Sequence, residues 1–265
     1  MNFTPSEGIA IASPAFWSER WVKHEIGWHI PTANPVLVEY LPKLIGQPYP
    51  AVDEHDGTPQ ALLQARTKAL AEYVRPAPSQ AGFLLPLCGK TIDLVFLARL
   101  GFRVVGIEIV EQAIQEFFQE NNIPFKTEQH VLHETKESVK VHTSTDPNMN
   151  ISIFQADLFA VTSKDVGALH FSFDRGSFVA MQPALRTKYA VTMTRILAPT
   201  ARILAAMIDY EEGVMAGPPF NVTNAAIEQA FSPVGSQIEY VEVKSNKTRF
   251  SFEMLERIVI IAMPK

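Results

Sequence analysis

The stretch "LLPLCGKTIDLVFLARLGFRVVGIEI", residues 84–109, contains the residues that most clearly suggest chemistry. Its apolar runs predict a strand, a tight turn, a helix and a second strand. Gly89 lies in the turn, and Glu108 follows it by 19 residues at the end of the second strand. In parallel sheets, ligands bind at the carboxyl ends of strands, where an acid at this position accepts hydrogen bonds from ribose hydroxyls. Gly89 and Glu108 therefore predict a nucleotide or nucleoside site.

The turn "PLCGK" favours one class of nucleotide ligand over another. A pyrophosphate needs a turn with several glycines, whereas Leu87, Cys88 and Lys90 surround a single Gly89 here. A nucleoside without phosphates needs only an acid for the ribose, apolar walls for the base and room for a short charged tail. S-adenosylmethionine is such a ligand, so the turn favours it over NAD. The alternative from these residues alone is an ordinary helix-end glycine and strand-end acid with no ligand.

Several other reactive residues have simpler interpretations. Cys88 is the single cysteine, which excludes an internal disulfide and a cysteine-rich zinc site. We expect it to be a buried apolar residue, because no Cys–His arrangement is indicated. Lys90 lacks the G-x-x-x-x-G-K pattern of a phosphate loop, so an exposed or salt-bridged lysine is expected. The histidines at 130, 133 and 142 are irregularly spaced in a polar segment, and we predict no metal site.

The apolar pattern along the chain predicts alternating strands and helices. Such alternation is typical of an α/β fold with a mostly parallel sheet covered on both faces. The final two strands follow the last helix with only a loop between them, so they must be antiparallel. The prediction is a doubly wound, mostly parallel seven-stranded sheet with an antiparallel C-terminal hairpin. Its expected strands are 83–87, 103–109, 151–154, 169–173, 201–208, 238–243 and 255–263.

The 265 residues are expected to form a single domain, 1–265, with two additions. Residues 1–60 are an N-terminal extension in which Trp17 and Trp21, four apart, share a helix face. Within it, the proline- and glycine-rich segment 31–57 is expected to wrap the surface. Residues 126–150 are polar, and we expect an exposed insertion there, either a hairpin or a mobile loop.

The amino-acid composition favours some classes of protein and disfavours others. Hydrophobic residues make up 47% and charged residues 19%, a balance typical of a globular chain with a full core. The net charge of −5 argues against a nucleic-acid partner, which would require a basic face. No apolar run approaches the ~20 residues of a membrane span, and no signal peptide is visible. We therefore expect a cytoplasmic protein without a membrane partner.

Four ordered blocks resemble the thiopurine S-methyltransferases, which are class I S-adenosylmethionine-dependent enzymes with a Rossmann-like seven-stranded sheet. The blocks span most of the domain and occur in the family's order. Together they are stronger evidence of a relationship than the motif "PLCGK" alone. They are "FWSERWVKHEIGWH" at 16–29, "LLPLCGKTIDLVFLARLGFRVVGIEIVEQAIQEFF" at 84–118, "FDRGSFVAMQP" at 173–183 and "GPPFNV" at 217–222.

The resemblance implies roles for individual residues. The segment from Trp17 to Trp28 corresponds to a lid that closes over the cofactor, with Trp28 facing the substrate. Arg175, in "DRG", matches an arginine near both substrate and cofactor, and its neighbour Asp174 is a second candidate catalytic residue, with a structural role equally open. Phe220 is expected at the substrate. The expected cofactor-binding residues are Trp17, Trp21, Leu87, Gly89, Glu108, Ala156, Asp157 and Arg175.

Two departures from the family lie on the expected substrate side. One is the proline- and glycine-rich insertion around residues 46–60, and the other is Trp28, where part of the family has phenylalanine. Of the properties that the family resemblance implies for this chain, the identity of the substrate is therefore the one it supports least.

The chemistry implied is methyl transfer from S-adenosylmethionine to a small thiol, leaving S-adenosylhomocysteine. Charge is neutralised in this reaction, so a dry aromatic site helps, and an indole face attracts a sulfonium by ~0.5–2 kcal/mol. Arg175 is expected to stabilise the thiolate or orient a substrate carboxylate. The family and the mildly acidic charge suggest a monomer.

Three alternatives remain beside this prediction. The same cofactor can serve another acceptor, such as a halide, a selenium or tellurium species, or an oxygen or nitrogen nucleophile. An NAD-dependent oxidoreductase is disfavoured by the missing glycines. An inactive binding module is opposed by the presence of Glu108, Arg175 and the tryptophans.

Overall fold

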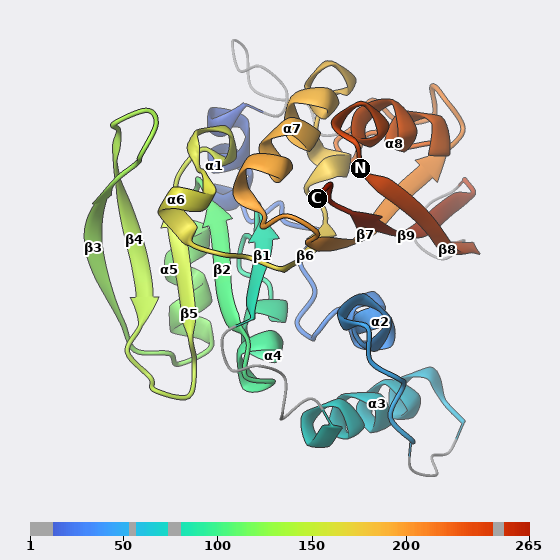
Figure 1. Cartoon of the computed structure of the whole chain (residues 1–265), viewed down its shortest axis with the longest axis horizontal. Helices are drawn as coiled ribbons and strands as arrows, with labels where there is room; N and C mark the ends of the chain where they lie inside the picture. Colours follow the sequence, from blue (N-terminus) through green and yellow to red (C-terminus); the bar gives the residue numbers. More distant parts are fainter. Residues whose placement is uncertain (1–12, 53–56, 74–80, 246–251) are drawn as a thin grey trace.

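The structure is a computed structural model that describes residues 13–52, 57–73, 81–245 and 252–265. A single nine-stranded sheet runs through the molecule in the order β3-β4-β5-β2-β1-β6-β7-β9-β8 (Figure 1). Five neighbouring strands are parallel, and the C-terminal pair closes one edge in antiparallel fashion. These seven strands are the expected sheet with its terminal hairpin, so the predicted fold class is confirmed. Their bounds are β1 (Gly82–Pro86), β2 (Arg103–Glu108), β5 (Ile151–Gln155), β6 (Phe171–Arg175), β7 (Arg202–Tyr210), β8 (Gln237–Ser245) and β9 (Met254–Ala262).

The remaining two strands come from the polar segment 126–150. It forms the hairpin of β3 (Phe125–Val131) and β4 (Ser138–Ser144), and β4 pairs with β5 so that the sheet gains two strands beyond seven. A hairpin was one of the two forms expected for this segment. Most of β3 is exposed, which explains its polar sequence, while His142 and Val139 of β4 are buried against the sheet.

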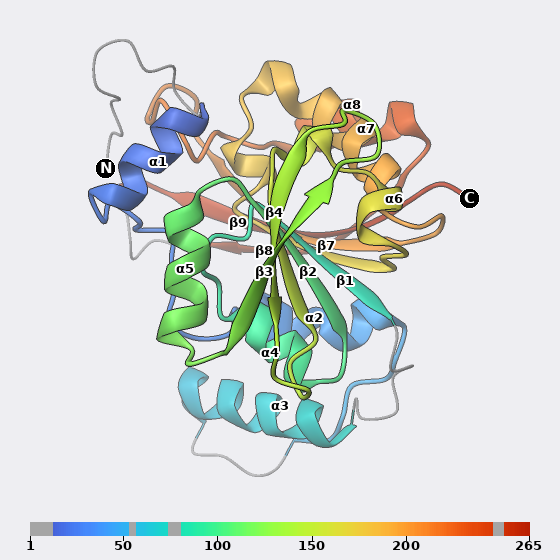
Figure 2. The ribbon, with the colours of Figure 1, turned by 90° about the vertical axis from the view of Figure 1, so that its left-hand side faces the viewer.

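Helices cover both faces of the sheet (Figure 2). One face packs against α2 (Pro35–Ile45), α4 (Asp93–Arg99) and α5 (Glu111–Glu120). The other face packs against α6 (Ser163–Val166), α7 (Arg186–Ile196) and α8 (Asn224–Phe231). Helix α3 (Pro59–Tyr73) lies outside α2, and α1 (Pro14–Val22) lies beyond the ends of β1 and β2 (Figure 1). None of the helices in the described ranges is long and apolar enough to cross a membrane.

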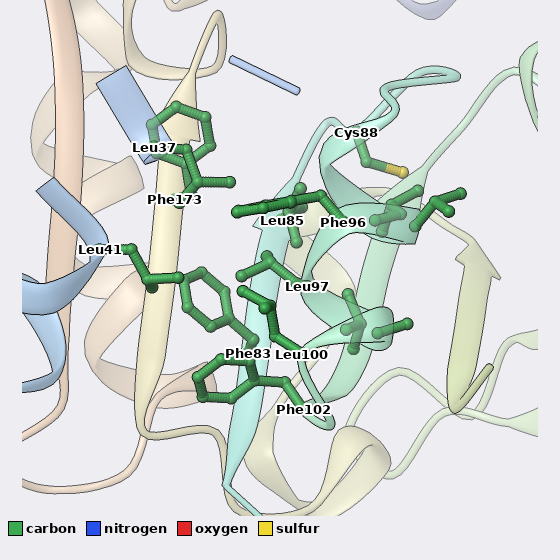
Figure 3. Packing of buried hydrophobic residues seen from close by; sticks show 14 of the residues in the cluster. Leu37, Leu41, Phe83, Leu85, Cys88, Phe96, Leu97, Leu100, Phe102 and Phe173 are labelled. Atoms are coloured by element: carbon green, nitrogen blue, oxygen red, sulfur yellow. The ribbon is translucent and has the colours of Figure 1, made fainter. Parts of the chain in front are cut away.

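Helix α2 corrects the expectation that residues 31–57 wrap the surface. The Asn34 side chain caps the helix by accepting a hydrogen bond from the Val36 amide at 2.9 Å, and Gly46 ends it in the left-handed conformation, with φ of 72°. Its leucines at 37, 41 and 44 are fully buried, and Figure 3 shows two of them pointing toward strand residues of β1 and β6. The high proline content and Pro42 within the helix concealed this i, i+4, i+7 spacing.

The strand order indicates where on the sheet a ligand would bind. The strand order changes direction between β1 and β6, because β2 and β5 lie to one side of β1 while β6 and β7 lie to the other. The carboxyl ends of these parallel strands meet at one edge of the sheet, and such a switch point is where ligands bind in open α/β folds. Glu108 ends β2 and Arg175 ends β6 at this edge.

Candidate active site

A cavity of about 360 Å³ opens at this edge of the sheet. Its walls come from the segment 16–30 above, the turn 85–91, and the ends of β2, β6, β7 and β9. Most of the predicted site residues line this one cavity although they lie far apart in the sequence. Those residues are Trp17, Trp21, Trp28, Leu87, Gly89, Glu108 and Arg175.

The turn after β1 has an unusual backbone. Leu87 and Gly89 both have positive φ, 45° and 52°, and leucine rarely adopts this conformation. The Cys88 amide donates a 3.1 Å hydrogen bond to the carbonyl of Ile107, which holds the turn against β2. A Cβ on Gly89 would lie 3.1 Å from the indole ring of Trp21, so the glycine also lets the lid approach closely.

Glu108 is buried, with 6% of its surface exposed, and its carboxylate is held by the main chain. Oε2 accepts a hydrogen bond from the Gly89 amide and Oε1 one from the Val110 amide, both at 2.8 Å. Burial raises the pKa of Glu108, and these backbone hydrogen bonds counteract part of that rise. Two oxygens can accept about four hydrogen bonds, so the carboxylate is oriented and still has capacity for a ligand's hydroxyl groups.

The N-terminal segment, which the family resemblance predicts to be a lid, contributes an aromatic cluster to the cavity lining. The Trp28 ring lies edge-on to those of Trp17 and Trp21, at centroid distances of 5.4 and 6.2 Å. Gln112 of α5 donates a 3.2 Å hydrogen bond to the Trp21 carbonyl, which ties the lid to the domain. Lys90 is salt-bridged as expected, with Nζ 2.7 Å from carboxylate oxygens of both Glu116 and Glu120.

Arg175 reaches from the end of β6 into the cavity. Its Nη1 donates a hydrogen bond to the main-chain carbonyl of Trp28, so the guanidinium joins the sheet to the lid. Its positive charge lowers the pKa values of two neighbouring carboxyl groups, Asp93 and Glu256, although burial outweighs this effect and raises both. The pKa of His29 is lowered by its burial and by the nearby charges of Lys90 and Arg175.

Three further ionisable residues line the cavity that were not predicted from the sequence, namely His29, Asp93 and Glu256. Asp93 Oδ1 accepts a 2.6 Å hydrogen bond from the Asn34 amide, so it also anchors the start of α2. A signal existed for Glu256, because apart from Glu256 itself and its neighbour Arg257 the strand "MLERIVIIA" is apolar. His29 closes the first of the four family-like blocks but has no pattern of its own.

Besides Asp174, three predicted residues do not line the cavity. Ala156 and Asp157 lie beside it, because the Ala156 amide donates a 3.1 Å hydrogen bond to the Glu108 carbonyl. Asp157 is exposed, and its Oδ1 accepts a 2.9 Å hydrogen bond from the Phe159 amide. Phe220 packs its ring over Gly217, next in sequence to the lining residues Pro218 and Pro219. Contacts of these three with a ligand stay predictions.

The contacts of Asp174 favour the structural role that was the alternative to a catalytic one. This carboxylate is 1% exposed and lies outside the cavity lining. Oδ1 accepts hydrogen bonds from the amides of Ser177 and Phe178, and Oδ2 accepts one of 2.7 Å from the Tyr189 hydroxyl. Asp174 therefore fixes the turn that follows Arg175, and a catalytic role for it stays a prediction.

Replacing Asp174 by asparagine should lower the free energy of unfolding by about 1–2 kcal/mol, because three charge-assisted hydrogen bonds become neutral ones or are lost. Urea unfolding followed by tryptophan fluorescence measures this. Glu211→Gln, at an exposed position, controls for loss of one negative charge. Unchanged stability with abolished turnover would return Asp174 to the catalytic residues.

The described residues contain no group of three or more His, Cys, Asp or Glu side chains placed to hold a metal ion. The acidic and basic residues of the cavity lining are Glu108, Arg175, His29, Lys90, Asp93 and Glu256, and most of the other lining residues are apolar or aromatic.

Comparison with known proteins adds independent findings. The profile of the thiopurine S-methyltransferase (TPMT) family matches residues 60–259. A thiopurine S-methyltransferase of Psychrobacter cryohalolentis is 30% identical over 91% of this chain and 94% of its own length. One of Shewanella woodyi is 31% identical over 80% of this chain and 78% of its own. Among solved structures, magnesium protoporphyrin IX methyltransferase from Synechocystis PCC 6803, with bound S-adenosylhomocysteine, aligns over 94% of this chain and 99% of its own. The TM-score is 0.51 and the sequence identity 11%, so this likeness supports the fold alone.

Proposed function

The chain belongs to the thiopurine S-methyltransferase family of S-adenosylmethionine-dependent enzymes, and on that premise we propose that it methylates the sulfur of a small thiol in the cavity described above. The observation that carries the proposal is the convergence of Glu108, Arg175 and three lid tryptophans on one cavity. These residues come from β2, β6 and the N-terminal segment, and only the fold brings them together.

The residues of the cavity fit S-adenosylmethionine. Glu108 offers an oriented carboxylate for the ribose hydroxyls, and Leu87 and Ile109 give apolar walls beside it. The turn has one glycine and so suits a nucleoside without phosphates. The indole rings of the lid present faces that attract a sulfonium. The bound cofactor supplies an activated methyl group on its positively charged sulfur.

The other end of the cavity would hold the acceptor. Its walls are largely apolar, from Phe173, Ile208, Met215 and Met254, and Trp28 covers it. Excluding water from this space favours the transition state, because the charges of sulfonium and thiolate disappear as the methyl group moves. Arg175 would stabilise the thiolate and hold it in line with the methyl group, and such alignment is the main contribution required of the protein.

Calorimetric titration with S-adenosylhomocysteine, followed by assays with aryl and alkyl thiols, tests the proposal. We expect micromolar binding of the nucleoside and turnover of at least one thiol. NADH serves as the control ligand, because it shares the ribose but carries a pyrophosphate. Binding of NADH without binding of S-adenosylhomocysteine would contradict the cofactor assignment.

The affinity for S-adenosylhomocysteine should fall as the pH decreases from about 8 to about 5. Ribose hydroxyls donate to the ionised form of Glu108, and protonation removes an acceptor. Burial raises the pKa of this carboxyl group in the free protein, so the decrease begins at a higher pH than for an ordinary glutamate. Titrations across this range, repeated on Glu108→Gln, measure the effect. The same pH dependence in Glu108→Gln would assign it to another group.

A further inference from the structure

Glu256 lines the cavity from β9, whereas Glu108 lines it from β2. Strands β2 and β9 are four positions apart in the sheet, which corresponds to about 19 Å at ~4.8 Å per strand. Glu256 pairs with Ile208 in the β7–β9 ladder, and paired residues point to the same face. Ile208 and Glu256 both line the cavity.

The environment of Glu256 is unusual for a carboxylate. Met254, two residues earlier on the same face of β9, is buried, and Ile258, two residues later, is fully buried. Within the described ranges, no side-chain hydrogen bond or ion pair joins the Glu256 carboxylate to another residue. A half-buried carboxylate without such a partner is costly, and groups of this kind concentrate at functional sites. Burial raises its pKa, which agrees with this geometry.

The charges nearest to Glu256 have partners elsewhere. Lys244 stands opposite it in the β8–β9 ladder, but its Nζ lies 2.7 Å from Glu39 Oε2 on α2 and 3.5 Å from Glu242. Arg175 lies close enough for its charge to lower the pKa of Glu256, but its Nη1 donates to the Trp28 carbonyl. Glu256 is therefore the carboxylate that β9 contributes to the cavity lining.

We propose that Glu256 determines acceptor specificity, by accepting a hydrogen bond from an N–H or cationic group of the acceptor and by disfavouring acceptors that carry a carboxylate on that side. This inference rests on the proposed function, because it assigns the β9 end of the cavity to the acceptor. The chemical class that it selects is a thiol bearing a nitrogen donor away from the sulfur.

Three aryl thiols of similar shape test the inference at about pH 7.5, well above the ordinary carboxyl range. They are thiophenol, 4-mercaptobenzoate and 4-(aminomethyl)thiophenol, which are neutral, anionic and cationic on the ring. In Glu256→Gln, the kcat/KM for the anionic thiol relative to thiophenol should rise about 5- to 30-fold, and that for the cationic thiol should fall by a similar factor. Glu253→Gln, at an exposed position three residues earlier, should leave both ratios unchanged.

A binding measurement separates failure of this inference from failure of the proposed function. The methylated products of the same thiols are titrated into the protein, and binding is followed by the fluorescence of the tryptophans that line the cavity. This measurement needs no turnover. If the wild-type protein methylates none of the thiols, the proposed function fails, and the ratio of binding constants still reports on Glu256. If Glu256→Gln and Glu256→Met both leave the charge preference unchanged, the inference is wrong.

Discussion

Replacing Glu108 by alanine should weaken the binding of S-adenosylhomocysteine about 5- to 150-fold, which corresponds to a loss of about 1–3 kcal/mol. The carboxylate would no longer accept the ribose hydroxyls, and in the buried site they find no water to replace it. The amides of Gly89 and Val110 lose their acceptor as well, so the turn that shapes the cavity is held less firmly. Isothermal titration calorimetry on both proteins measures the difference.

Glu111→Ala is the matched control for this experiment. Glu111 lies three residues away at the start of α5, where its carboxylate pairs with Lys140 at 2.6 Å on the surface. It should bind the nucleoside as the wild-type protein does. Equal affinities of Glu108→Ala and the wild-type protein would place the cofactor elsewhere in the molecule.

Replacing Arg175 by alanine should lower kcat/KM for a thiol about 100- to 1000-fold, as is typical when a group that stabilises charge in a buried site is removed. The thiolate would lose its positive neighbour, and the lid would lose the hydrogen bond to the Trp28 carbonyl. The affinity for S-adenosylhomocysteine should fall less than about tenfold, because Glu108 remains in place. Steady-state kinetics and calorimetry on the same preparations compare the two quantities.

Two further variants, Arg175→Lys and Arg99→Ala, test whether the loss of kcat/KM in Arg175→Ala comes from the lost charge at this position. Lysine keeps the charge but loses the planar fork, so partial recovery of kcat/KM would assign the effect to charge. Arg99 is exposed at the last turn of α4, and its removal should change neither quantity. Equal losses of turnover and of cofactor affinity in Arg175→Ala would make Arg175 a cofactor-binding residue.

The fold was predictable where local patterns agreed with the tertiary structure. The β1-α4-β2 unit carries apolar strands, a helix and a turn glycine in one short stretch, and the structure reproduces it closely. Helix α2 was missed because Pro35 and Pro42 suggested a loop, although the buried face of leucines decides its conformation. The hairpin of β3 and β4 has a polar sequence, because only part of it faces a core.

The candidate site was predictable where residues belong to a motif. Gly89 and Glu108 were found from their spacing, and Arg175 from its family-like block. Glu256 lacks a motif, and its role depends on the pairing of β9 with β7, which no local pattern reveals. Asp174 belongs to a family-like block, but its side chain points to Tyr189, whereas the side chain of the next residue, Arg175, faces the cavity. In a strand, adjacent residues face opposite sides.

The most direct test of the account follows a carbon-13 methyl group from S-adenosylmethionine into 4-mercaptophenol, which offers sulfur and oxygen in one molecule. Nuclear magnetic resonance of the product identifies the methylated atom. We predict a single S-methyl product formed together with an equal amount of S-adenosylhomocysteine. Methylation on oxygen alone, or binding of the cofactor with no transfer to this or any other thiol, would contradict the assignment as a thiol methyltransferase.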